Sequence, residues 1–265
     1  MKSILICGVG SIGKRHIENF SKFFSNIDIV DTNPKRIKES LKRYKIRNFY
    51  SSTQRALSDQ NYDAVVVATP PHTHQNIAKK VIEKETHLFI EKPLGMNVNG
   101  WQKLHNTCKK KKLIAYIGYC HRFIPYTITL KKLMQSKVIG KIAHANLRWG
   151  SYLPDWHPWE NYKSFYMSKK EQGGGALRDE SHGIDLVRYL IGEVDKVNAI
   201  IDNTSKLQMT SDDAAFLTFK MKNGSLIQIN FDLSSRFPRI NFEIVGSDGT
   251  IIWDRVENNL KIFTI

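Results

Sequence analysis

The sequence predicts an α/β protein: a doubly wound parallel sheet comes first, and an α+β region with an open, mostly antiparallel sheet follows. Short apolar runs alternate with longer polar, Lys-rich segments over the first part of the chain. This rhythm stops near residue 122, where stretches of alternating polar and apolar residues begin. A glycine-rich turn directly follows the first apolar run. We therefore expect two domains, residues 1–121 and residues 122–265.

Five apolar runs in the first half predict buried parallel strands. They are residues 3–7, 27–30, 64–68, 88–90 and 113–118. The polar segments between them predict helices, at residues 14–24, 33–44, 74–84 and 99–111. The near-continuous Val and Ile of the third run are typical of strands covered on both faces, and a strand–helix–strand order favours right-handed crossovers.

The second half predicts a sheet of a different kind. We expect a helix over residues 127–136, a long strand over residues 141–150 and a helix near residues 179–190. Further strands are predicted at residues 196–201, 214–221, 226–233, 240–245 and 251–254. Asn-Gly at 223–224 and Asp-Gly at 248–249 indicate hairpin turns, so these strands should pair antiparallel.

Composition limits the class of protein. The hydrophobic content of 41% is that of a globular chain, and no apolar run approaches the 18 residues or so of a membrane span. The opening MKSILICGVG is too short for a signal peptide and is interpreted as a first strand. We expect a cytoplasmic protein with no membrane partner.

The net charge of +15 raises the question of nucleic acid. The basic residues are spread over predicted helix surfaces and loop tips, without aromatic interleaving or a helix-turn-helix pattern. We expect no nucleic-acid partner. Two interpretations stay open: a field that draws in an anionic small molecule, and a merely solvated surface.

Three cysteines, Cys7, Cys108 and Cys120, show no CxxC spacing. Cys7 and Cys120 lie in apolar, strand-like runs and are interpreted as small buried hydrophobes. We expect no metal site.

The glycine-rich turn, residues 8–13, reads GVGSIG and stands between a predicted strand and a predicted helix. Gly8 would permit the tight turn, Gly10 would let the backbone approach a pyrophosphate, and Gly13 would let helix and strand pack closely. The helix N-terminus would then face the phosphates. An ordinary glycine-rich turn is the alternative; the context favours a Rossmann dinucleotide site.

An acid at the end of the second strand favours NAD over NADP. Asp31 stands at the distance expected for the carboxylate that accepts hydrogen bonds from the adenosine ribose and repels a 2′-phosphate. Lys35 and Arg36 follow closely, which leaves room for NADP. Asp28, earlier in the same strand, is interpreted as a surface residue without a role.

Four further segments make the chain resemble the Gfo/Idh/MocA family, the glucose–fructose oxidoreductase and inositol dehydrogenase group. They are ATPPHTH at 68–74, EKP at 91–93, GYCHRF at 118–123, and GGG at 173–175 running into His182 and Asp185. Their order and spacing match those of the family over nearly the whole chain. The resemblance implies NAD-dependent hydride transfer at a CH–OH group of a sugar, polyol or nucleotide sugar. Family members usually continue with a C-terminal helical segment, so this chain is expected to be short there.

Lys92 is the first candidate catalytic residue. It follows an apolar strand and should lie at the carboxyl edge of the parallel sheet, where a partly desolvated lysine can exchange a proton with a hydroxyl. The resemblance implies a catalytic or orienting lysine at this position. A snorkelling surface lysine is the alternative.

His182 is the second candidate, at the start of a helix that follows a glycine-rich loop. The resemblance implies an acid/base site here, with an Asp four residues earlier, where this chain has Arg178; Asp179 lies three before. Either Asp179 serves, or Arg178 faces a carboxylate- or phosphate-bearing substrate. A core or helix-capping histidine is the alternative.

Other residues complete the expected site. The aromatic loop 152–159 offers Trp156 to a sugar face, or packs on the sheet, and Arg122 is a candidate anion contact. The residues expected to line the cofactor crevice, besides the glycines, are Ser11, Ile12, Thr69, Pro70, His72, Glu91 and Lys92.

The sequence leaves three functions open. The first is a dehydrogenase or reductase, a homodimer or tetramer associated through its C-terminal sheet. A cofactor-sensing binding protein of the same fold is the second, and an enzyme that uses NAD transiently to eliminate or hydrolyse a sugar group is the third.

Overall fold

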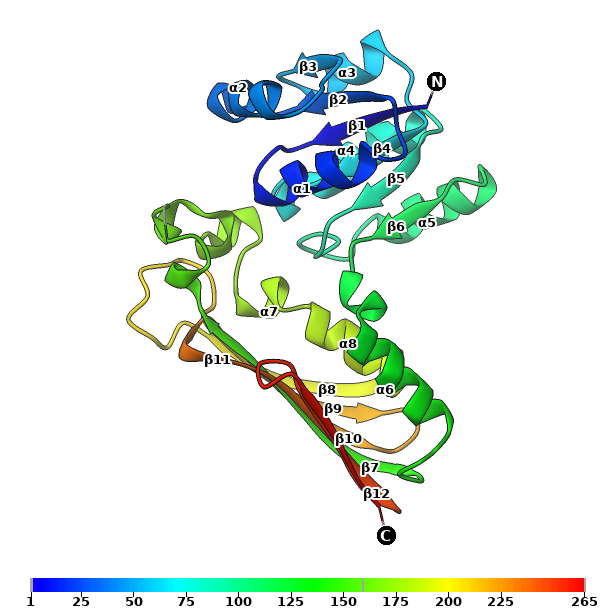
Figure 1. Cartoon of the computed structure of the whole chain (residues 1–265), viewed down its shortest axis with the longest axis vertical. Helices are drawn as coiled ribbons and strands as arrows, with labels where there is room; N and C mark the ends of the chain where they lie inside the picture. Colours follow the sequence, from blue (N-terminus) through cyan, green and yellow to red (C-terminus); the bar gives the residue numbers. More distant parts are fainter. Residues whose placement is uncertain (1, 159, 265) are drawn as a thin grey trace. The chain divides into compact units, whose positions relative to one another are not determined.

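A computed structural model describes residues 2–158 and 160–264 of the chain (Figure 1). The chain divides into two compact units, Met1–Gly118 and Tyr119–Ile265. Each unit has its own sheet and its own core of buried side chains, and each is described by itself.

The sheet of the first unit has six strands, all parallel, in the order β3-β2-β1-β4-β5-β6. The strands are β1 (Ser3–Cys7), β2 (Asn26–Val30), β3 (Asn48–Tyr50), β4 (Ala64–Val67), β5 (His87–Ile90) and β6 (Ala115–Ile117). Strand order reverses direction between β1 and β4. In open α/β sheets, ligands bind outside the carboxyl ends of the strands at such a point.

Five helices cover the two faces of this sheet (Figure 1). They are α1 (Ser11–Phe20), α2 (Pro34–Arg43), α3 (Thr53–Asp59), α4 (Pro71–Glu83) and α5 (Trp101–Lys110). Alternate residues of β1 separate the two cores: Ile4 and Ile6 pack with α1 and α2, whereas Leu5 and Cys7 pack with α3 and α4. The predicted doubly wound parallel sheet is confirmed.

One strand and one helix of this unit were not expected. Strand β3 has only three residues, of which only Tyr50 is buried, so it leaves no apolar run in the sequence. Helix α3 is seven residues long and begins at the cap residue Ser52, whose hydroxyl accepts from the backbone N–H of Arg55. Both lie below the length at which periodicity is informative.

The interpretation of Asp28 as a surface residue is wrong. Its side chain is fully buried, receives two hydrogen bonds from the Arg47 guanidinium at 2.9 and 2.7 Å, and accepts a third from the Tyr62 hydroxyl at 2.8 Å. Burial alone would raise the pKa of this carboxyl, but the hydrogen bonds from Arg47, Tyr62 and Asn48 outweigh burial and hold the pKa below its usual value. Asp28 therefore ties β2 to β3.

The second sheet has seven strands, in the order β13-β12-β11-β7-β10-β9-β8. The strands are β7 (Ile142–Tyr152), β8 (Val194–Asp202), β9 (Ala214–Met221), β10 (Leu226–Asp232), β11 (Ser234–Gly246), β12 (Gly249–Asp254) and β13 (Asn259–Thr264). Strands β7 and β10 pair parallel, and every other pair is antiparallel. The prediction of a mostly antiparallel sheet is confirmed, although β13 was not expected.

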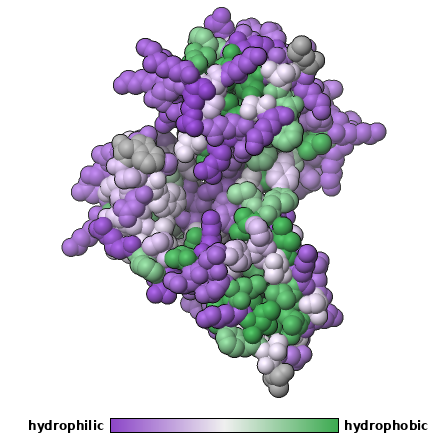
Figure 2. All heavy atoms as spheres, in the orientation of Figure 1, coloured by the Kyte–Doolittle hydropathy of each residue, from purple (hydrophilic) through white to green (hydrophobic). Residues whose placement is uncertain are grey.

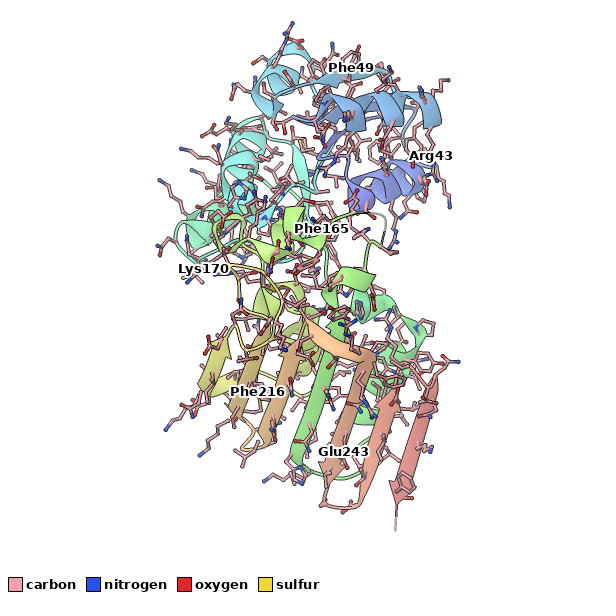
Figure 3. All side chains as sticks on the ribbon, turned by 90° about the vertical axis from the view of Figure 1, so that its left-hand side faces the viewer. Arg43, Phe49, Phe165, Lys170, Phe216 and Glu243 are labelled. Atoms are coloured by element: carbon pink, nitrogen blue, oxygen red, sulfur yellow. The ribbon has the colours of Figure 1, made fainter. Side chains whose placement is uncertain are left out.

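One face of this sheet is buried and the other is open. Ala145, Leu147 and Trp149 of β7 face a core that includes Leu130 of α6 (Pro125–Gln135) and Leu186 of α8 (His182–Leu190). The alternating residues point away from this core, and side chains such as Phe216 and Glu243 stand on the seven-stranded sheet (Figure 3). The short helix α7 (Ala176–Asp179) and five 3₁₀ helices complete the unit. The 3₁₀ helices are Cys120–Phe123, Leu153–Asp155, Tyr162–Ser164, Tyr166–Ser168 and Lys170–Gln172.

The two units differ at their surfaces. On the face shown in Figure 2, the first unit is largely hydrophilic, as its many Lys and Arg residues require, while apolar residues gather in the lower part of the second. None of the helices in the described part of the chain is long and apolar enough to cross a membrane.

Candidate functional site

Two of the three glycines in the turn after β1 are required by the protein itself. Gly8 has φ +88°, and a Cβ there would lie 2.6 Å from the carbonyl oxygen of Ala68. A Cβ at Gly13 would lie 1.9 Å from the carbonyl oxygen of Gly8. Any side chain at either position would have to displace main chain, which is the close packing of strand and helix expected from the motif.

Gly10 differs, because the protein leaves the space beside it open. The nearest atom to a Cβ at Gly10 would be Nη1 of Arg36, at 3.9 Å. Gly10 is also the N-cap of α1, and no acidic side chain lies in the first turn of that helix. The positive end of α1 and open space beside the main chain of Gly10 are therefore available together, which suits a pyrophosphate. The residues present fit a dinucleotide.

Asp31 is placed at this turn by its own hydrogen bonds. It is buried, its Oδ2 accepts from the backbone N–H of Val9 at 2.8 Å, and its Oδ1 accepts from the N–H of Asn33 at 2.8 Å. Each carboxylate oxygen can accept a further hydrogen bond. The same carboxylate that could receive ribose hydroxyls therefore also holds the glycine turn.

The residues predicted to line the crevice follow β1 and β4 in the chain. Ser11 and Ile12 open α1, and both are exposed. Thr69 and Pro70 follow β4, and the hydroxyl of Thr69 lies 2.6 Å from that of Thr73 in the first turn of α4. The predicted residue His72 is exposed in the same turn.

His74 connects two loops of this edge and was not predicted as a site residue. Its fully buried ring lies with Nε2 2.7 Å from the carbonyl oxygen of Thr69 and Nδ1 3.1 Å from that of Pro93. Burial lowers the pKa of His74, and the nearby carbonyls oppose this shift without cancelling it. The neutral ring donates only one hydrogen bond, which we assign to the shorter contact.

Glu91 and Lys92 follow β5 at the same edge. Oε1 of Glu91 lies 2.7 Å from Nε2 of His16 on α1, and its Oε2 accepts from the backbone N–H of Lys92 at 3.2 Å. The Lys92–Pro93 peptide bond is cis. Gly118 makes room for this carboxylate, because a Cβ there would lie 3.0 Å from Glu91 Oε2. The structure thus gives Glu91 a positioning contact to α1 and to Lys92.

In the second unit, His182 begins α8 inside a group of aromatic rings. It is 8% exposed, and its ring centroid lies 4.2 Å from that of His121, 5.7 Å from that of Tyr119 and 6.2 Å from that of Trp149. Burial raises the pKa of Tyr119, so the phenol stays neutral. His121 and Tyr119 were not among the predicted site residues.

Arg122 and Asp185 form a two-point ion pair in this unit. Nε of Arg122 donates to Oδ2 of Asp185 at 2.8 Å, and Nη2 donates to Oδ1 at 2.5 Å. The guanidinium also lies 5.0 Å from the centroid of the Tyr189 ring. Arg122 was predicted to contact a substrate anion. Its Nε and Nη2 groups, which would bind a substrate carboxylate at two points, already bind the carboxylate of Asp185.

Arg178 and Asp179 differ sharply in their surroundings. The carboxylate of Asp179 is 1% exposed, accepts from the Tyr166 hydroxyl at 2.7 Å and receives the backbone N–H of Gly175 at 3.3 Å. Arg178 is only half-buried, and its Nη1 lies 3.4 Å from the carbonyl oxygen of Gly174. Asp179 is thus held by the glycine loop, whereas the protein holds Arg178 weakly.

Trp156 packs partly on the core of the second unit, and its indole N–H donates to the Ser151 hydroxyl at 2.9 Å. Trp159, in the same aromatic loop, lies outside the described residues. The interpretation of Cys120 as a buried strand residue is wrong: it begins a 3₁₀ helix and is exposed, since the last parallel strand ends at Ile117. Cys7 is buried as expected, and its pKa is raised to about 12.

The fold of the first unit and its glycine turn define the class of protein: one with a Rossmann domain of the NAD-binding type. Residues 2–119 match the oxidoreductase family with an NAD-binding Rossmann fold, and residues 127–252 match the GFO/IDH/MocA C-terminal domain. The chain belongs to the GFO/IDH/MocA oxidoreductase family.

Characterised relatives share about a quarter of their residues with this chain. A levoglucosan dehydrogenase of Pseudarthrobacter phenanthrenivorans is 27% identical over 85% of the chain, which spans 64% of that relative's length. A myo-inositol 2-dehydrogenase of Thermotoga maritima is 28% identical over 98% of the chain and 77% of the relative. A levoglucosan dehydrogenase structure with NADH and levoglucosan is similar with a TM-score of 0.84 at 25% identity, covering 98% of this chain and 75% of that one.

Proposed function

We propose that the chain is an NAD(H)-dependent oxidoreductase that transfers a hydride to or from a secondary hydroxyl or ketone of a sugar or polyol. The observation that carries the proposal is Gly10. The packing of the protein requires glycine at 8 and 13, but the space beside Gly10 is open and faces the N-terminus of α1. The ligand, rather than the fold, explains this glycine.

Two residues are proposed for proton transfer. Lys92 follows β5 at the carboxyl edge of the first sheet. Its backbone N–H donates to the Glu91 carboxylate, and the carbonyl oxygen of the next residue, Pro93, lies 3.1 Å from Nδ1 of His74. Bound NAD(H) would supply the hydride acceptor or donor, and Lys92 would exchange the proton of the reacting hydroxyl. In the second unit, His182 is proposed as an acid/base residue, since its ring is oriented by the packed aromatic group around it. The relatives named above support a polyhydroxylated substrate.

The cofactor is proposed to be NAD rather than NADP. Asp31 carries a buried carboxylate next to the turn, where a 2′-phosphate would meet a like charge. We expect NADH to bind about tenfold or more tightly than NADPH, measured as two dissociation constants. Asp31 also accepts hydrogen bonds from the backbone N–H groups of Val9 and Asn33. To test the role of its charge, Asp31→Asn is therefore a better variant than Asp31→Ser, because asparagine has the size of aspartate and keeps an oxygen that can accept one of these bonds. Equal affinities for the two cofactors in the starting protein would remove this argument.

Exchange of labelled hydride tests the reaction itself. NAD⁺ is incubated with sugars, polyols and nucleotide sugars that carry labelled hydrogen on their carbinol carbons, and label in the NADH formed is measured. A dehydrogenase transfers label to the cofactor stoichiometrically with NADH formation. Product without net NADH change supports NAD-assisted elimination or hydrolysis instead. NADH binding with neither product nor label supports the cofactor-sensing alternative.

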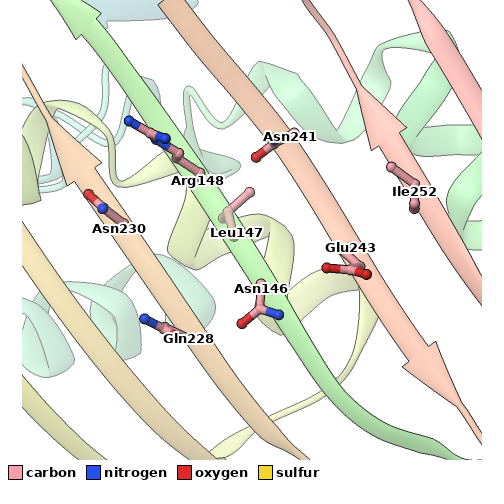
Figure 4. Close-up of a pocket in the computed structure, with 8 residues that line it drawn as sticks. All are labelled: Asn146, Leu147, Arg148, Gln228, Asn230, Asn241, Glu243 and Ile252. Atoms are coloured by element: carbon pink, nitrogen blue, oxygen red, sulfur yellow. The ribbon is translucent and has the colours of Figure 1, made fainter. Parts of the chain in front are cut away.

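We propose that two copies associate through the open face of the second sheet. That face carries a shallow depression lined from β7, β10 and β11 by residues such as Asn146, Gln228 and Asn241, with Arg148 and Glu243 on neighbouring strands (Figure 4). A two-fold contact lets each of these charges meet its opposite on the partner copy. The apolar side chain of Phe216 stands at the margin of the same face.

Two exposed phenylalanines provide a matched test. Phe216 on the second sheet is 48% exposed and Phe49 on the first is 56% exposed (Figure 3). Phe216→Glu should shift the molecular mass, measured by light scattering, toward the monomer, while Phe49→Glu should leave it unchanged. A monomeric starting protein would refute the association. The cytoplasmic location and the absence of nucleic-acid and membrane partners remain predictions from composition.

A further inference from the structure

Three metal-ligating side chains come together in the second unit, although the sequence showed no metal-binding spacing. Cys120 and His121 open the 3₁₀ helix Cys120–Phe123, and His182 opens α8. The sulfur and one ring nitrogen from each histidine all lie within 4.8 Å of one another. Cys120 is exposed, His121 is half-buried and His182 is buried, so the group runs from solvent inward.

These three donors are those that zinc prefers. Zinc binds Cys sulfur at about 2.3 Å and His nitrogen at about 2.0–2.1 Å in a tetrahedron, which puts ligand atoms roughly 3.3–3.6 Å apart. The spacing found here would have to contract by on the order of 1 Å, which side-chain rotation of the exposed Cys120 and the half-buried His121 can supply. Three protein ligands leave the fourth position for water or an added ligand.

The surroundings favour a bound cation in most respects. The ring of Trp149 lies 5.0 Å from that of His121, so one wall is apolar and weakens competition from water. The positive charge of Arg122 is neutralised by Asp185. One group opposes a cation: Nη1 of the exposed Arg255 lies 3.5 Å from Nε2 of His121. The positive charge of this arginine would repel a metal ion bound to His121.

We propose that Cys120, His121 and His182 form a site for a divalent transition metal ion of the zinc class, and that the bound metal inhibits the enzyme. The metal takes a lone pair of the His182 ring, which can then no longer accept a proton. This consequence rests on the proposed function, whereas metal binding does not. Binding exchanges the thiol proton of Cys120 for the metal, so the released proton goes to solvent and affinity falls at acid pH.

Cobalt is the probe for the site, because a Co²⁺–thiolate bond absorbs light and the assay needs no turnover. Metal-stripped, reduced full-length protein is titrated with Co²⁺. We expect a thiolate-to-cobalt band that saturates at one equivalent and is lost in Cys120→Ser. His121→Asn and His182→Asn should each weaken Co²⁺ binding by more than about tenfold. Arg255→Ala should strengthen it, because a competing positive charge is removed.

Two controls separate this site from other thiols and imidazoles. His144 is exposed on β7, and Cys108 is buried in the first unit. His144→Asn and Cys108→Ala should both keep the cobalt band and its affinity. A starting protein without the band, or a band that persists in Cys120→Ser, would overturn the site.

Inhibition is measured separately, as the rate with Zn²⁺ divided by each variant's own metal-free rate. Zn²⁺ should slow the starting protein and His144→Asn to below about a tenth, with recovery on adding a chelator, and should affect Cys120→Ser far less. Cobalt binding with a Zn²⁺-insensitive rate would overturn the inhibitory role. If no sugar is turned over at all, the proposed function fails, and the cobalt titration alone still decides whether the metal site exists.

Discussion

The glycine turn of the first unit and the histidine group of the second are built in opposite ways. The turn is made by residues 8–13 and by Asp31, and its shape comes from main chain that has no room for a side chain at Gly8 or Gly13. The histidine group is made by side chains from three distant segments, around residues 121, 149 and 182. Substitutions in the turn should therefore change stability or cofactor binding, whereas in the histidine group the effect on stability depends on whether the side chain belongs to the core, as that of Trp149 does.

The largest effect is expected at Gly13. A Cβ at Gly13 would overlap the carbonyl of Gly8 at 1.9 Å, so Gly13→Ala should destabilise the first unit by about 3 kcal/mol or more. Gly10→Ala, where the space is open, should cost about 1 kcal/mol or less but weaken NADH binding strongly. Urea unfolding and NADH titration of both variants check this. If the two variants lost stability and NADH affinity to the same extent, the conclusion that Gly13 is needed for packing and Gly10 for the ligand would be wrong.

Substitution of Lys92 should change turnover and leave stability and NADH binding nearly unchanged. Lys92→Ala is expected to lower turnover by about 10²–10⁴-fold, the usual worth of a positioned proton-transfer group, with NADH affinity and the unfolding midpoint little changed. Steady-state rates, NADH titration and urea unfolding measure the three quantities. Reduced stability with full activity per folded molecule would assign Lys92 to the surface instead.

Variants of Arg178 and Asp179 test which of these two residues of the second unit acts on the substrate. If Arg178 binds an acidic sugar, Arg178→Lys should weaken that substrate by about tenfold to a hundredfold through loss of two-point binding, with NADH affinity unchanged. Asp179→Asn should lower turnover only if this carboxylate serves as the acid, and KM and kcat should be compared for acidic and neutral sugars.

Tyr166→Phe is the control for Asp179, because it removes the hydroxyl that donates to this carboxylate while leaving the carboxylate in place. If Tyr166→Phe is as inactive as Asp179→Asn, the tie between the two residues matters rather than proton transfer by Asp179. A silent Arg178→Lys beside an inactive Asp179→Asn would remove the main support for acidic substrates.

The smallest effect is a pH dependence at His74. Burial holds its folded pKa below the unfolded value of about 6.5, so the unfolded chain binds a proton that the folded chain does not. Stability from this group is therefore complete above about pH 6.5 and is lost as the pH falls below it. His74→Gln, which keeps one donor, should flatten this part of the curve of unfolding free energy against pH. An unchanged slope would show that other groups set it.

The sequence by itself determined both sheets, the order of most elements, the glycine turn and Asp31, because each depends on neighbours in the chain: apolar periodicity, turn residues, and a strand followed at once by a helix. Short elements such as β3 were not predicted, because three residues are too few to show a periodic pattern of apolar side chains. Only the tertiary structure decided that Asp28 is a buried partner of Arg47, that the His74 ring lies near the carbonyl of Pro93, and that Cys120 is exposed near His182. The residues of each pair are far apart in the chain, and burial and pairing between such residues arise only when packing brings them together.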